Sequence, residues 1–332
     1  MQQYRDTDYA AVSAALHARE AKLLTQAMAE RMIDAATPEE SYKTLLECGY
    51  APLERCTLEN VEHALSQARR ELYREVSVLA PDKRIIELFQ IKYDYHNAKL
   101  ALKSKRSGED VSRLAMDCGR FDAQKVLRGE TSAVSAAMSR AMAQAESEAG
   151  HSGDVRMAEL LLDRACYEEM SALASETGST FLKDYVALQI DAVNLRTLVR
   201  ARRMGCEDDV LAAAMLPGGH IPAGQLKGAR GDHLSSLTHG TPLDSAGELA
   251  AKLLDSGGGL TEFERACDDA LMFYLQRARR TPFGPEVVAG YLGERGGVHR
   301  RAHHFIRQDR GHRGGGHPRA AAHELSLREA AA

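Results

Sequence analysis

The sequence predicts an all-α fold, and three observations support this prediction. Residues that favour helices, mainly Ala, Leu, Glu, Arg and Lys, dominate the 332-residue chain, which has no Trp and only 5% aromatic residues. Apolar residues recur at helical intervals over long stretches. No segment of more than four residues has the alternating pattern of a strand. We therefore expect packed helices and no sheet.

Three helices are predicted in the first 76 residues. Residues 9–36 have apolar positions at helical spacing and are expected to form one long helix. Thr37 is a good N-cap for the next helix, because Glu40 completes a capping box with it. That helix is expected to end near Gly49, which can adopt the left-handed C-cap conformation. Residues 57–76 form the third predicted helix, with Thr57 as its N-cap.

The strongest helical pattern covers residues 81–107, from Pro81 to the residue before Gly108. An apolar stripe runs along this segment and returns, 97 residues later, in the segment 178–204. The stripes consist of Leu88, Ile91, Tyr95, Ala98 and Leu102 in the first copy and Tyr185, Leu188, Ala192, Leu195 and Val199 in the second. The chain therefore contains an internal repeat.

The same polar signature, an acid followed by an amide and a base, interrupts both apolar segments. Its members are Asp94, Asn97 and Lys99 in the first copy and Asp191, Asn194 and Arg196 in the second. The acid and the amide are three residues apart, so they share one helix face, whereas the base projects elsewhere. Unpaired buried polar groups are costly, so we expect Lys, Arg or loop amides to pair with them. The signature then has a structural role and fixes the register between each long helix and its neighbours.

Catalysis or metal binding by Asp94 and Asp191 is the alternative interpretation. No motif supplies the nucleophile or base that a catalytic pair would need. His96 is expected to be a surface or packed residue, because its counterpart in the second copy is Val193. We expect no cofactor.

Composition excludes several other classes of function. The formal net charge of -4 does not suggest a nucleic-acid partner, and the chain lacks a phosphate-binding G-x-x-x-x-G-K-[ST] motif. No segment has the 18 to 20 apolar residues of a membrane span, and the polar N-terminus does not resemble a secretory signal. Six cysteines without C-x-x-C spacing indicate reduced thiols rather than a zinc site. These features predict a cytoplasmic protein.

Four segments together resemble the C subunit of the V-type (A/V-type) ATPases, the homologue of the eukaryotic d subunit. They read YAAVSAALHAREAKLL (9–24), YDYHNAKLALK (93–103), QIDAVNLRTLVRARRMG (189–205) and TPFGPEVVAGYL (281–292). The resemblance covers about residues 9–292. It implies three similar helical units around a pseudo-threefold axis, which form a funnel within a single domain, residues 1–293.

The resemblance also implies a function without catalysis. The funnel would sit on the membrane rotor ring, receive the central stalk, and couple the two for ATP-linked proton or sodium transport. The protein would then be cytoplasmic and peripheral to the membrane through its complex. A helical-repeat adaptor that serves another complex is the alternative.

Residues 294–332 depart from the family pattern. This segment has 8 Arg, no Lys and 6 of the 13 His residues, where a third copy of the signature helix should stand. We expect a disordered or irregular tail and hypothesise a reading-frame shift near codons 293–297. A metal-dependent helical enzyme that uses His299, His303 and His304 is a further alternative.

Overall fold

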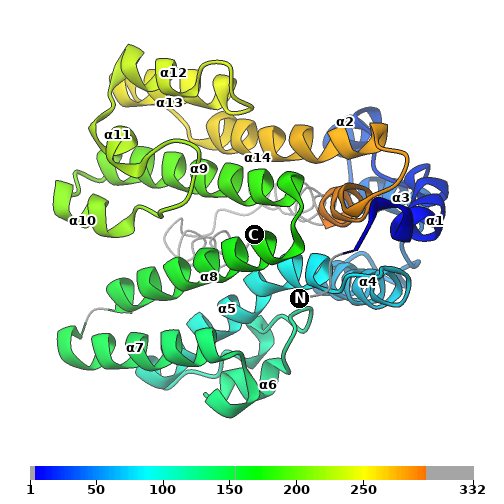
Figure 1. Cartoon of the computed structure of the whole chain (residues 1–332), viewed down its shortest axis with the longest axis horizontal. Coiled ribbons are helices and arrows are strands. Elements are labelled where there is room, and N and C mark those ends of the chain that lie inside the picture. Colours follow the sequence, from blue (N-terminus) through cyan, green and yellow to red (C-terminus); the bar gives the residue numbers. More distant parts are fainter. Residues whose placement is uncertain (1–3, 154, 297–332) are drawn as a thin grey trace. The chain divides into compact units, whose positions relative to one another are not determined.

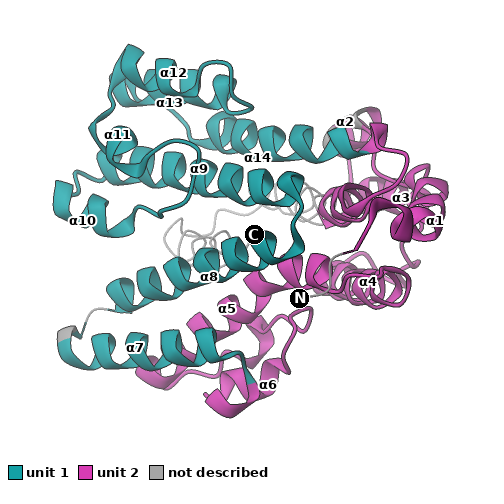
Figure 2. Ribbon diagram, viewed as in Figure 1, with its two compact units in different colours: residues 1–3, 134–278 teal, residues 4–133, 279–332 magenta. Residues whose placement is uncertain are grey.

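The computed structural model describes residues 4–153 and 155–296, and these residues form helices joined by turns and loops (Figure 1). No strand occurs in either range. The predicted all-α fold class is therefore confirmed for this part of the chain. The described residues divide into two compact units, unit 1 with residues 134–278 and unit 2 with residues 4–133 and 279–296 (Figure 2).

Unit 2 contains the first copy of the repeat. Its elements are η1 (Asp6–Tyr9), α1 (Ala10–Glu20), α2 (Gln26–Asp34), α3 (Pro38–Glu47), α4 (Leu58–Leu79), α5 (Arg84–Ser107), η2 (Ser112–Leu114), α6 (Ala123–Leu127), η3 (Thr131–Ala133) and the helical residues 285–296. Within this unit α2 packs on α3, and α5 contacts both α4 and α6. The long helix α5 is thus held between an earlier helix and the short helix that follows it.

Unit 1 contains the second copy. Its elements are α7 (Ala136–Ser152), α8 (Val155–Thr177), α9 (Thr180–Arg203), α10 (Asp208–Ala214), α11 (Ala223–Gly228), α12 (Gly231–Thr238), α13 (Asp244–Ser256), α14 (Thr261–Gln276) and the turn η4 (Arg277–Arg280), which ends in unit 2. Helix α8 packs along both α7 and α9, and α9 also contacts α11, α13 and α14. Helix α9 is thus central to its unit.

The prediction of one helix over residues 9–36 is wrong, because α1 ends at Glu20 and α2 begins at Gln26. Thr25 is extended, and its hydroxyl accepts a hydrogen bond from the backbone N–H of Met28 at 3.2 Å. Thr25 is therefore the N-cap of a new helix, which the apolar spacing alone did not reveal.

The predicted N-caps of the next two helices are confirmed, but the predicted capping box is not formed, because the carboxylate of Glu40 accepts from the N–H of Ala36 at 3.0 Å and not from that of Thr37. Thr37 accepts a hydrogen bond from the N–H of Glu40, and Thr57 accepts one from the N–H of Asn60, both at 3.2 Å. Gly49 follows α3 with a φ of 83°, the left-handed conformation that was expected there.

The long repeat helix starts later than predicted. Helix α5 begins at Arg84, not at Pro81, because Asp82 accepts hydrogen bonds from both the backbone and the guanidinium of Arg84. Its predicted end is confirmed, since Gly108 is left-handed with a φ of 73°. The second long helix begins at Thr180, and the hydroxyl of Ser179 caps it.

All ten residues of the two predicted apolar stripes are buried. In the middle of α5, burial extends beyond the apolar stripe to the polar residues Asp94, His96, Asn97 and Lys99. Asp191 and Asn194 are buried in α9 in the same way. The acid and the amide of the signature thus lie in the core of each unit, where each polar group needs a partner.

The last described helical residues are 285–296, so residues 294–296 of the predicted tail are helical. Glu294 is buried and forms an ion pair with Arg279. The rest of the tail, residues 297–332, lies outside the described residues, as do the expected third copy and the tail histidines. Within the described ranges no helix is long and apolar enough to cross a membrane.

Candidate functional site

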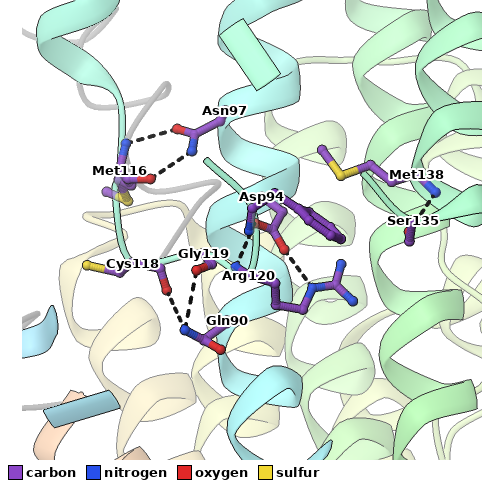
Figure 3. A network of polar contacts seen from close by, with 10 residues as sticks. Gln90, Asp94, Asn97, Met116, Cys118, Gly119, Arg120, Ser135 and Met138 are labelled. Carbon is purple, nitrogen blue, oxygen red and sulfur yellow. Dashed lines mark hydrogen bonds and ion pairs between the residues drawn. The ribbon is translucent and has the colours of Figure 1, made fainter. Parts of the chain in front are cut away.

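The amide of the signature holds the main chain of a later residue in both copies. The Nδ2 of Asn97 donates to the carbonyl of Met116 at 2.7 Å, and its Oδ1 accepts from the N–H of Met116 at 2.9 Å (Figure 3). Asn194 makes the same pair of bonds with Leu216, both at 2.8 Å. Each asparagine therefore satisfies both main-chain groups of one loop residue, as a neighbouring strand would.

The acid of the first copy, Asp94, holds the loop a few residues further on. Its Oδ1 accepts from the backbone N–H groups of Arg120 at 2.9 Å and Phe121 at 3.3 Å. Its Oδ2 accepts from Nε of Arg120 at 2.6 Å (Figure 3). The buried carboxylate thus has two main-chain donors and a permanent cation, which offset the cost of its burial.

The acid of the second copy, Asp191, makes equivalent main-chain contacts. Its Oδ2 accepts from the N–H of His220, and its Oδ1 accepts from the N–H of Ile221, both at 3.0 Å. The imidazole Nδ1 of His220 lies 3.3 Å from Oδ2 of Asp191, where the first copy has the guanidinium of Arg120. We call these arrangements the first clamp (Asp94, Asn97 and residues 116–121) and the second clamp (Asp191, Asn194 and residues 216–221).

A glycine allows each loop to approach its carboxylate. A Cβ on Gly119 would lie 2.1 Å from Oδ1 of Asp94, and a Cβ on Gly219 would lie 2.1 Å from Oδ1 of Asp191. Any other residue would therefore displace the loop or the acid. Sequence reasoning missed these two glycines, which are 100 residues apart rather than 97 because the second copy has three more residues between the signature and the loop. A repeat search that allowed a short insertion could have found them.

Burial governs the titration of both acids. Burial raises the pKa of Asp94 to about 6, while the Arg120 guanidinium and two backbone N–H groups hold the shift in check. Burial also raises the pKa of Asp191, against the N–H groups of Ile221 and His220 and the His220 ring. Removal from water is thus the largest effect in both clamps.

The first clamp has one further support. Gln90 lies one helical turn before Asp94 in α5, and its Nε2 lies 3.2 Å from the carbonyl oxygen of Cys118 and 3.3 Å from that of Gly119 (Figure 3). The equivalent position in α9 is Ala187, which has no polar side chain. The two clamps therefore share their main-chain contacts and differ in the side chains that reinforce them.

In the second copy the base of the signature does not join the acid and the amide. Lys99 is buried in α5. Arg196 points to α14, where its guanidinium forms ion pairs with Glu264 and Asp268, both at 2.7 Å. In the second copy the base therefore ties the long helix to another helix instead of to the loop.

The described residues offer little for catalysis. His96 is buried, and its Nε2 lies 3.1 Å from the carbonyl oxygen of Leu114. No group of three or more His, Cys, Asp or Glu side chains in residues 4–153 and 155–296 is placed to hold a metal ion. All six cysteines are free thiols. Because N–H donors already surround both carboxylates, the clamps are suited to hold the main chain rather than to bind a substrate.

Comparison with known proteins identifies the family. The model of the ATP synthase (C/AC39) subunit family matches residues 12–295. The chain belongs to this family. The resemblance found in the four sequence segments is thereby confirmed, and the matched range contains both clamps.

Relatives from bacteria and archaea are similar over most of their length. The chain is 21% identical to the C subunit of the V-type sodium ATPase of Enterococcus hirae, with 86% of this chain and 89% of the relative covered. It is 25% identical to the C subunit of the V-type ATP synthase of Thermus thermophilus, covering 87% and 90%. It is 22% identical to the C subunit of the A-type ATP synthase of Methanocaldococcus jannaschii, covering 86% and 78%.

Proposed function

We propose that this chain is a non-catalytic coupling subunit of a rotary V/A-type ATPase, placed between the central stalk and the membrane rotor ring. A coupler that transmits torque must be stiff and present two binding faces, and it needs no chemistry of its own. The family match over residues 12–295 supports the place in such a complex. The transported ion would be a proton or sodium.

The two clamps are the observation that carries this proposal. In each copy a buried acid and a buried amide fix the loop after a long helix by main-chain hydrogen bonds. A loop held in this way loses most of its freedom to move against the helix, since each buried bond is costly to break. A helical body whose loops are fixed to its longest helices is suited to transmit force.

We also propose that the complete fold has three such units around a pseudo-threefold axis. Two copies of the repeat are present. The third would follow residue 292 and would be encoded in another reading frame. Resequencing the gene from codon 280 past the stop codon, and reading all three frames, tests this. A frame that continues into an amphipathic helix with an acid, an amide or small residue, and an Arg in the repeat's order supports the proposal. The absence of such a frame contradicts it.

The coupling role is tested with the holoenzyme reconstituted in vesicles, with and without this chain. Without the chain, we expect ATP hydrolysis by the catalytic head to continue while ATP-driven ion uptake is lost. Adding the full chain back should restore uptake. Equal uptake in both preparations, or failure of the chain to copurify with the complex, would contradict the proposal and favour an adaptor in another complex.

A clamp variant links the structure to this role. The double substitution Asn97→Ala and Asn194→Ala removes the main-chain contacts to Met116 and Leu216. We expect a lower number of ions transported per ATP hydrolysed at unchanged copurification. The exposed Asn60→Ala is the matched control and should leave the ratio unchanged.

A further inference from the structure

A cavity of about 340 Å³ lies between α4 and α5 of unit 2, next to the loop of the first clamp. This volume is at the lower end of the range for sites that hold small molecules. The polar part of its lining consists mainly of Arg70, Tyr73 and Arg74 of α4, Gln90 of α5, and Asp117 and Cys118 of the loop. The three residues of α4 are spaced three and four apart, so they share one helix face.

The lining carries more positive than negative charge. Its carboxylate belongs to Asp117, which forms an ion pair with Arg70. Burial raises the pKa of Cys118 to about 11 and the pKa of Tyr73 well above its ordinary value, so both groups are neutral at neutral pH. Arg74 is exposed and forms no ion pair within the described part of the chain. One cation of the lining is therefore uncompensated.

A third guanidinium lies beside this lining. Arg69 is next to Tyr73 and Cys118, and its Cζ lies 5.3 Å from the centre of the Tyr93 ring. Its Nε is buried and has no hydrogen-bond partner. Because the groups around Arg69 are neutral, its positive charge adds to that of the cavity.

The neighbouring acids of α4 do not cancel this charge. Glu75 forms an ion pair with Arg19 of α1 at 2.8 Å, and Glu71 accepts a hydrogen bond from Gln67 at 3.1 Å. Neither acid lines the cavity. Three guanidinium groups and one carboxylate thus leave an excess of two positive charges, which a phosphate dianion would match.

We propose that this cavity binds a phosphate group, either as inorganic phosphate or as the monoester of a small organic molecule. A guanidinium suits this ligand because its planar fork donates two N–H groups to a pair of phosphate oxygens. Arg74 is the main ligand, since it has no competing acid. Arg70 divides its charge between the phosphate and Asp117. The site is separate from the coupling role, and neither proposal depends on the other.

Titration calorimetry of the full chain at constant ionic strength tests the site with three probes: inorganic phosphate, glycerol phosphate and acetate. Phosphate should bind, and the tighter of the two phosphate compounds identifies the source of the group. Acetate carries a single negative charge and should bind at least about tenfold more weakly. The proposal is overturned if neither phosphate compound binds below about 10 mM, or if acetate binds as tightly as they do.

Two substitutions should change the affinity for phosphate in opposite directions. Arg74→Gln removes the uncompensated cation and should weaken binding about tenfold. Asp117→Asn removes the competing carboxylate of Arg70 and should tighten binding about three- to tenfold. The exposed Arg203→Gln, in unit 1, is the matched control and should leave the affinity unchanged.

Circular dichroism spectra of the variants show whether each is folded like the wild type. Arg74 and Asp117 lie at the surface, so both variants should fold. If phosphate binds to Arg74→Gln as tightly as to the wild type, or binds more weakly to Asp117→Asn, it binds elsewhere on the chain and the proposal is overturned.

Discussion

The first and second clamps make the same main-chain contacts with different loops. In both, an asparagine binds the N–H and C=O of one loop residue, and an aspartate three residues earlier binds two successive N–H groups. The loop side chains differ, with Met116, Arg120 and Phe121 in one and Leu216, His220 and Ile221 in the other. Only the glycine that touches the carboxylate is shared.

This difference shows what the repeat preserves. Because the helix binds main-chain groups, the loop side chains can change without loss of the contact. The glycine cannot, since a Cβ would collide with the carboxylate in either copy. The side chains that reinforce the clamp, Arg120 and Gln90 in the first and His220 in the second, set how strongly each loop is held.

The largest expected effect is that of Asp94→Ala. It leaves two N–H groups and the Arg120 guanidinium without their buried acceptor, at a cost of about 4 kcal/mol in the free energy of unfolding. Asp191→Ala should cost about 2 kcal/mol, because the half-exposed His220 can turn to water. Urea unfolding measures both, with the exposed Asp209→Ala as control. Equal losses would show that the side-chain partners do not distinguish the clamps.

The asparagines should respond alike. Asn97→Ala and Asn194→Ala each remove two hydrogen bonds from a buried loop residue, so each should lower the free energy of unfolding by about 2 to 3 kcal/mol. Thermal or urea unfolding provides the comparison. A difference of more than about 1 kcal/mol between the two variants would contradict the equivalence of the clamps.

The glycines test the close approach of loop and acid. Gly119→Ala and Gly219→Ala should each cost about 2 kcal/mol through the clash with the carboxylate. In the double variant Asp94→Ala with Gly119→Ala, the loss should be smaller than the sum of the single losses, because the clashing atom is gone. Additive losses would mean that Gly119 is needed for another reason.

The free energy of unfolding should depend on pH through the titration of Asp94. Burial raises its pKa from 3.8 to about 6, so the folded chain holds this proton more tightly than the unfolded chain. The contribution to stability is therefore present at low pH and is lost as the pH rises through about 6, by about 1 kcal/mol between pH 5 and pH 7. The difference in the free energy of unfolding between wild type and Asp94→Asn, measured with urea, should change with pH by this amount. A constant difference would contradict it.

The smallest effect is expected at Gln90. Gln90→Ala removes the donor to two loop carbonyls of the first clamp and should cost about 1 kcal/mol. The reciprocal change, Ala187→Gln, tests whether the second clamp can accept the same support. If Gln90→Ala has the same urea midpoint of unfolding as the wild type, the hydrogen bonds of Gln90 do not stabilise the first clamp.

The sequence predicted the helices and the repeat well, because both depend on local patterns. The apolar stripes of α5 and α9 follow from residue spacing, and Thr37, Thr57, Gly49 and Gly108 follow from capping rules. The break at Thr25 was missed because apolar spacing continues across it and only the cap ends the pattern.

For the partners of the signature, the sequence predicted the kind, which is Lys, Arg or loop amides, but not which residues supply them. Asp94 and Asn97 bind main-chain groups 19 to 27 residues later. Every residue has main-chain groups, so the residue types in the sequence do not show which of them are the partners. The glycines were the available signal, but the three-residue insertion hid them from a search at constant offset. Sequence reasoning therefore found the residues that hold the loops without finding the loops.

Amide exchange of the full chain tests the central claim most directly, that both long helices hold their following loops through main-chain hydrogen bonds. The amides of Met116 and Leu216 donate to Asn97 and Asn194, although neither lies in a helix. We predict that both are protected to a similar extent and that each loses protection in its own asparagine-to-alanine variant. Exchange of either amide at the rate of an open loop in the wild type would contradict the account.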